Sequence, residues 1–387
     1  MAQRIYVAGT GQHIGKTTST LGLMAALKSR FSRVGYCKPV GQEVVMQQNI
    51  RVDKDALLFS RVMGFTLEAN VHSPVILGKG ATTAYLDDPE GFNFDEQILH
   101  AANILDQRND MVVYEGTGHP GVGSVVELSN AVVAKMLNAK VVLVVEGGIG
   151  NTIDKLSLSL ALFNEMNVSV IGVIVNKVIP EKMDKVRHYV GGKLNLMGLK
   201  LLGVIPLDKS LGYAIMKTVE QAVQGTYHFY KENQANRIEG IVPGSLIEEI
   251  QDIEKSKNLL LVVSYKRAGE ALKKLDIISK KAGMDKAPIS GVLLTGEGRP
   301  DQPDHYQDFY LKYVEKHKIP VISTHLDTLG AFTKIERLEV KINYSTPWKV
   351  ERAIELVKDN VNLDLIIDAL NGRQVSEMPN GRDQFPK

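Results

Sequence analysis

The feature that most constrains this chain is a tight turn that joins a short apolar strand, beginning at Ile5, to a helix, and that ends in Gly15-Lys16-Thr17. Backbone N–H groups around such a turn, together with the positive end of the helix, attract phosphate oxygens. Lys16 is then expected to meet the β- and γ-phosphates, and Thr17 to place its hydroxyl on a bridging Mg²⁺ ion. The pattern therefore predicts a nucleoside triphosphate site.

The turn is a variant of the usual phosphate loop, because its leading glycine is Gly9 and Thr10 stands where the usual glycine would be. The strand and the helix that the motif requires are both predicted, and the alternative is a glycine-bearing turn that binds nothing. The residues expected to contact the nucleotide are Gly11, Gln12, His13, Ile14, Gly15, Lys16, Thr17 and Thr18.

Length and charge narrow the class of protein. A chain of 387 residues is more than one core usually supports, so two domains are expected, with three as the alternative. A net charge of +2 without a long basic run gives no reason to expect a nucleic-acid or membrane partner. The single cysteine, Cys37, excludes an internal disulfide, and no signal-peptide pattern is visible, so a cytoplasmic protein is expected.

Apolar runs alternate with helix-period segments along the first half of the chain. Such alternation predicts an α/β fold in which a parallel sheet is flanked by helices on both sides. Helices are expected near residues 16–29, 55–63 and 95–107. After the opening strand, further strands are expected at 34–38, 111–114, 141–145, 168–175 and 201–205.

The polar residues at the ends of these strands are candidate ligands, because ligands of parallel sheets bind at the carboxyl ends of the strands. Glu115 ends an apolar strand, where a carboxylate is costly unless a cation neutralises it. Thr17, Asp55 and Glu115 are therefore expected to surround Mg²⁺. An ion pair with Lys38 is the alternative for Glu115, and a helix N-cap is the alternative for Asp55. Asn176 follows another strand, and its amide is expected to pair with an adenine edge.

These strand ends, taken in order, resemble those of dethiobiotin synthetase over about the first 210 residues. The shared segments are Gly9-Thr10, Gly15-Lys16-Thr17, Lys38-Pro39-Val40, Asp55-Ala56-Leu57, Glu115-Gly116 and Val175-Asn176. The resemblance implies a P-loop sheet and an ATP-dependent carboxylation of a diamine followed by ring closure.

The resemblance also implies roles for individual residues. Lys16 would contact phosphates, Lys38 would face the substrate carbamate, and Asn176 would hold adenine. On the substrate side the chain departs from the family, with Gln12-His13 in place of Thr-Glu and Gln42 in place of serine. The resemblance therefore implies that the nucleotide half of the site carries over, with ATP and Mg²⁺ as cofactors, and a small carboxylate or amine is the candidate for a second ligand.

A second resemblance concerns the run from Lys38 to Gln42, which is similar to the dethiobiotin-synthetase-like domain at the amino end of long phosphate acetyltransferases. In those proteins the domain is regulatory, and the catalytic transferase domain has no room in this chain. A smaller α/β DRTGG-like domain is expected to follow, with strands at 259–264, 289–294 and 320–323. The predicted domains are 1–212, 213–345 and a C-terminal helix with a loose tail, 346–387.

Three functions remain open from the sequence. The first is an ATP-binding regulatory or accessory protein related to the amino half of phosphate acetyltransferases. The second is a ligase-like enzyme that activates a carboxylate or carbamate with ATP, for which Lys16 and Lys38 are the catalytic candidates. The third is an ATP-driven dimerisation switch, and relatives of the first domain make a homodimer or higher homo-oligomer the expected assembly.

Overall fold

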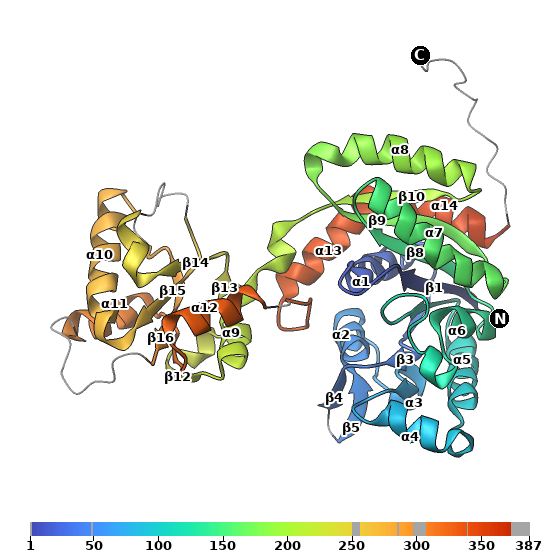
Figure 1. Cartoon of the computed structure of the whole chain (residues 1–387), viewed down its shortest axis with the longest axis horizontal. Helices are drawn as coiled ribbons and strands as arrows, with labels where there is room; N and C mark the ends of the chain where they lie inside the picture. The colour runs from blue at the N-terminus through green and yellow to red at the C-terminus, as the bar shows by residue number, and fades with distance from the viewer. Residues whose placement is uncertain are drawn as a thin grey trace, which may run out of the picture. The chain divides into compact units, whose positions relative to one another are not determined.

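The fold is described from a computed structural model, which covers residues 2–47, 49–249, 256–284, 286–296, 307–338 and 340–372. The chain divides into two compact units (Figure 1). The first comprises the described residues of Met1–Asp208 and Ile342–Lys387, and the second those of Lys209–Lys341. Each unit has its own sheet.

The first unit is built on a six-stranded sheet with the strand order β10-β9-β8-β1-β7-β2. All neighbouring strands run parallel, which confirms the predicted α/β class. The strands are buried on both faces, and for that reason their sequences are nearly continuous apolar runs. Their bounds are β1 Gln3–Gly9, β2 Val34–Cys37, β7 Met111–Glu115, β8 Lys140–Glu146, β9 Val170–Val178 and β10 Leu201–Pro206.

Helices cover both faces of this sheet. One face packs against α5 Phe94–Arg108, α6 Asn130–Met136, α7 Gly150–Glu165 and α8 Met183–Leu196. The other face carries α1 Lys16–Leu27 and two helices from the end of the chain, α13 Pro347–Asn360 and α14 Leu363–Leu370. Figure 1 shows α13 in orange-red beside the dark blue α1.

A polar stretch between β2 and α5 holds the predicted helix near 55–63 and several small elements that the sequence pattern did not predict. The strands β4 Val44–Gln47 and β5 Ile50–Asp53 form an antiparallel hairpin, and β3 Val40–Gly41 pairs with β6 Val75–Ile76. The helices of this stretch are α2 Lys54–Met63, α3 Ala69–His72 and α4 Ala81–Asp87. The hairpin matters for the site because β5 runs directly into α2.

The second unit has a five-stranded sheet of order β12-β17-β16-β15-β14, in which only the β12 edge strand is antiparallel among the described residues. The helices α10 Ala268–Lys281 and α11 Gln307–His317 pack on one face, and α9 Met216–Val223 and α12 Thr328–Glu336 on the other. The strands are β12 Thr226–Phe229, β14 Gly240–Pro243, β15 Leu259–Ser264, β16 Ile289–Thr295 and β17 Val321–Ser323, with β11 Ala214–Ile215 and β13 Arg237–Ile238 forming a separate pair.

The sequence assigned 346–387 to a separate C-terminal segment, and its helices α13 and α14 lie instead in the first unit. The reason is a close helix crossing: a Cβ atom at Gly22 of α1 would lie only 2.3 Å from the Cβ of Val357 in α13. The predicted loose tail lies, from residue 373 onward, outside the described residues. Within the part of the chain that the structure describes, no helix combines the length and apolar character needed to cross a bilayer.

Candidate functional site

The phosphate loop lies between β1 and α1, at the carboxyl edge of the parallel sheet. Its last residue, Gly15, has φ +89, a left-handed conformation that L side chains rarely adopt. A Cβ there would also lie 2.1 Å from Nδ2 of Asn176. Both backbone conformation and space therefore require glycine at the position where α1 begins.

Lys16 folds back over the loop. Its Nζ atom donates hydrogen bonds of 2.8 Å to the carbonyl oxygens of Gly11 and Gly118, and the residue is 8% exposed. These two carbonyls come from the loops after β1 and β7. The ammonium charge is thus held at the mouth of the loop, where anionic oxygens would gain most from it.

Three of the predicted side chains meet around Lys38, which directly follows β2. Its Nζ atom lies 2.7 Å from Oδ2 of Asp55 and 3.3 Å from Oε1 of Glu115. The hydroxyl of Thr17 donates to the same Glu115 oxygen at 2.8 Å. The ion pair that the sequence left open as the alternative for Glu115 is therefore present, and it brings Thr17, Asp55 and Glu115 to one point.

The charges in this cluster depend on one another. Burial raises the pKa of the Glu115 carboxyl, which is 0% exposed, while Lys38 and the Thr17 hydroxyl act in the opposite direction. Burial would lower the pKa of Lys38, but the carboxylates of Asp55, Glu115 and Asp53 outweigh it and raise that pKa above its ordinary value. Lys38 therefore stays cationic and neutralises carboxylates that burial would otherwise protonate.

Asp53, at the end of β5, caps α2. Its side chain accepts hydrogen bonds from the backbone N–H groups of Asp55 at 2.9 Å, Gln42 at 3.0 Å and Glu43 at 3.1 Å. Burial raises the pKa of Asp53 to about 6, although Lys38 opposes the shift. The alternative role of Asp55 as the helix cap is wrong, because Asp53 caps the helix and the Asp55 carboxylate points instead to Lys38.

The oxygen atoms gathered here suit a hard cation. Mg²⁺ is usually held by one or two carboxylates, with phosphate oxygens and waters completing its octahedron. Thr17, Asp55 and Glu115 offer one hydroxyl and two carboxylates, which fits a Mg²⁺ ion that arrives with a nucleotide. Among the described residues no group of three or more His, Cys, Asp or Glu side chains could hold a metal by itself.

The sequence patterns did not predict two residues that support the site. Tyr36, in β2, donates its hydroxyl to Oε2 of Glu115 at 3.2 Å and stacks on Phe59 of α2 with ring centres 3.9 Å apart. Asn130, at the start of α6, fixes the loop after β7 by accepting from Thr117 N at 3.0 Å and donating to the carbonyl of His119 at 2.6 Å. The sequence held a signal for Tyr36, because it precedes Lys38 by two residues and residues two apart in a strand lie on the same face.

Asn176 is buried, 4% exposed, and its Nδ2 donates to the carbonyl of Ile14 at 2.9 Å. The neighbouring Lys177 donates to the carbonyl of His13. The end of β9 therefore holds the backbone of the phosphate loop in place. Among the other loop residues Gln12 and His13 are exposed, and Gly11, Thr17 and Thr18 are half-buried.

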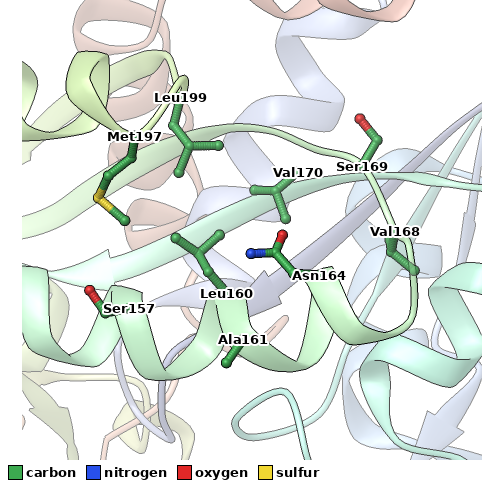
Figure 2. A pocket seen from close by; sticks show the side chains of 9 residues that line it. All are labelled: Ser157, Leu160, Ala161, Asn164, Val168, Ser169, Val170, Met197 and Leu199. Carbon is green, nitrogen blue, oxygen red and sulfur yellow. The ribbon is translucent and has the colours of Figure 1, made fainter.

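A groove elsewhere in the first unit lies beside α7, with apolar side chains such as Leu160, Val170 and Leu199 on its walls (Figure 2). Its volume is about 430 Å³. Val168, Ser169 and Val170 lie at the amino end of β9, whereas the phosphate loop lies at the carboxyl ends of the strands. The groove is therefore separate from the site described above.

A parallel sheet whose first strand passes through a glycine-bearing loop into a helix beginning Lys-Thr defines a P-loop protein. The chain belongs to the AAA_26 family, described as an AAA domain, whose model matches residues 3–214.

Comparison with known proteins confirms the resemblance drawn from the strand ends. A phosphate acetyltransferase of Synechocystis is 21% identical over 386 residues, which cover 96% of this chain and 52% of that protein. The ATP-dependent dethiobiotin synthetase of Clostridium kluyveri is 28% identical over 185 residues, which cover 46% of this chain and 75% of the synthetase. The chain thus spans about half the length of the phosphate acetyltransferases that it matches.

Among solved structures, the MinD cell division protein of Aquifex aeolicus is 15% identical with a TM-score of 0.33. The match covers 54% of this chain and 84% of that one. This structural similarity is too low to support an argument about function.

Proposed function

We propose that the first unit binds Mg²⁺·ATP and that the protein acts as a regulatory or accessory nucleotide-binding protein. The observation that carries the proposal is the convergence of Lys16, Thr17, Asp55 and Glu115 on the phosphate loop. Lys16 would hold the β- and γ-phosphates, and Thr17 with the two carboxylates would hold Mg²⁺. The metal would supply charge neutralisation of the phosphates.

Lys38 has a distinct part in this proposal. Its ammonium lies between the two carboxylates, 2.7 Å from Asp55 and 3.3 Å from Glu115. Asp55 and Glu115 would hold Mg²⁺, which would supply their counter-charge, and Lys38 would then contact the γ-phosphate or a second ligand. Such exchange of one cation for another keeps the buried carboxylates compensated in both states.

Calorimetric titration of the full chain with ATP, ADP and GTP, each with Mg²⁺, tests the proposal. Lys16→Ala should abolish the binding heat, and Thr17→Ala should weaken the dependence on Mg²⁺. The matched control is Lys28→Ala, because Lys28 lies at the far end of α1, is exposed and donates to the carbonyl of Met63. Titration of Lys16→Ala that matches the wild type would refute the site assignment.

A second function, an ATP-dependent ligase that activates a small carboxylate or a carbamate, is favoured by one observation. Lys38 is buried, cationic and directly beside the predicted metal ligands, where it could stabilise charge that develops on a transferring phosphoryl group. Release of ADP should then rise when particular diamines or small carboxylic acids are added. A flat response across such a panel, with ATP still bound, would refute the ligase function.

A further inference from the structure

The last described helices of the chain complete the unit that its first residues begin. The chain leaves the first unit after Asp208 and returns to it at Ile342. Oδ2 of Asp208 accepts a hydrogen bond of 2.6 Å from Nε of Arg352 in α13. An ion pair therefore ties the segment that leaves the first unit to α13, the helix that follows the returning segment.

The same helix α13 packs closely on the phosphate-loop helix α1. A Cβ at Gly22 would lie 3.0 Å from the carbonyl oxygen of Ala353, in addition to its overlap with Val357. Arg30, just after α1, pairs with Asp364 in the first turn of α14, the helix that follows α13. The two helices therefore run in the same direction, with their first turns at the same end.

Lys349 marks the end of α13 that lies toward the phosphate loop. It shares a helix face with Ala353 and Val357, because the three residues are spaced by four. Ala353 and Val357 meet Gly22, so Lys349 lies one turn closer to the end of α1 that begins at Gly15. Lys349 is 0% exposed, and burial lowers its pKa to about 8, so most of its ammonium remains charged at neutral pH.

We propose that α13 couples the phosphate loop to the two segments that join the units, residues 206–213 and 340–346. The inference rests on the proposed binding of Mg²⁺·ATP. A ligand shifts a conformational equilibrium only by its difference in affinity for the two states. The packing of α13 on α1 provides that difference, because α1 begins at the phosphate loop and a ligand that holds the loop in place favours the state in which the two helices are packed.

Tryptophan fluorescence can test the proposed coupling through α13. Trp348 is its one tryptophan, and the Nζ atom of Lys349 lies 5.1 Å from the centre of the indole ring. The full chain is titrated with Mg²⁺·ATP in a calorimeter and, in parallel, by Trp348 fluorescence. Hydrogen exchange is then followed at residues 206–213 and 340–346. We expect the emission to change with the calorimetric midpoint and exchange in both segments to slow severalfold.

Two variants separate coupling from binding. Arg352→Gln removes the charge pair with Asp208, so it should leave affinity within about twofold while the slowing at 206–213 is lost. Gly22→Ala, whose methyl group would overlap Val357 and separate α13 from α1, should weaken binding and abolish the slowing in both segments. The control is Arg187→Gln on α8, which removes an exposed pair with Asp184 and should leave affinity and exchange as in the wild type.

The outcomes distinguish this inference from the proposed function. Binding heat with no change in Trp348 emission or in exchange at the two segments overturns the coupling and leaves nucleotide binding intact. Absence of binding heat for every nucleotide overturns the proposed function, and the coupling with it. Slowing that survives both Arg352→Gln and Gly22→Ala shows that α13 does not couple the loop to the two segments.

Discussion

The ammonium of Lys38 lies 2.7 Å from Oδ2 of Asp55, and this contact neutralises the carboxyl edge of the first sheet. Both side chains lie in the cluster that also holds Glu115 and Thr17. A buried cation between carboxylates can be replaced by another cation, but its plain removal leaves uncompensated charge.

Lys38→Met should destabilise the first unit by about 3–5 kcal/mol without nucleotide, because Asp55 and Glu115 lose their shared counter-charge. Urea denaturation at neutral pH measures the change. Added Mg²⁺ should restore more stability to the variant than to the wild type if the carboxylates bind the metal. Lys54→Met is the control, because its pair with Glu43 is exposed, and its cost should be below about 1 kcal/mol.

Tyr36→Phe should cost about 1.5–3 kcal/mol, because it removes a hydrogen bond to a buried carboxylate while keeping the ring stacked on Phe59. It should also weaken Mg²⁺·ATP binding by leaving Glu115 easier to protonate. Tyr114→Phe is a matched control: the Tyr114 hydroxyl is buried and has no hydrogen-bond partner among the described residues. If the two variants proved equally stable, the role given to Tyr36 would be wrong.

Gly22→Ala should destabilise the first unit by about 1–3 kcal/mol, because the added methyl group overlaps Val357 and separates α13 from α1. Gly192→Ala on α8 is the control. A Cβ there meets nothing within 4 Å, so the gain in helix propensity should leave the protein neutral or more stable. Thermal unfolding of both variants measures the difference, and equal stabilisation would contradict the close crossing.

Lys349→Met should remove the rise in stability that the buried Lys349 gives the wild type between about pH 8 and pH 10.5. Burial lowers the folded-state pKa of Lys349 to about 8, from an ordinary value of 10.5. The unfolded chain therefore binds more protons between these two values, and wild-type stability rises as the pH increases across that window. Denaturation at several pH values, with Lys358→Met as an exposed control on the same helix, checks the slope.

Much of the first sheet was predictable because its strands are short apolar runs between helical segments. Lys38, Glu115 and Asn176 were found from the rule that parallel strands end at one edge. The residues that these three contact were harder to predict. The alternation of side chains along a strand gives the face on which a residue lies, but not the residue that it contacts. The adenine contact expected of Asn176 stays a prediction, since its amide holds the carbonyl of Ile14 in the structure.

The position of α13 could not be read from the sequence. Its apolar stripe predicts a buried face, but an amphipathic helix fits many surfaces. The partner is Gly22, a residue near the other end of the chain, and nothing local to either residue specifies the contact. The hairpin of β4 and β5 was missed for a related reason, because its strands are only partly buried and carry a weak alternation.

The crossing of α1 and α13 has a consequence for how the protein is made. During synthesis the phosphate loop and all six strands of the first sheet emerge early, but the helix that covers α1 emerges only after the whole second unit. A chain growing from its amino end must therefore keep an apolar helix surface uncovered while more than a hundred further residues are added. That interval is when chaperones would have the most to protect, and when mistaken pairing with another nascent chain would be easiest.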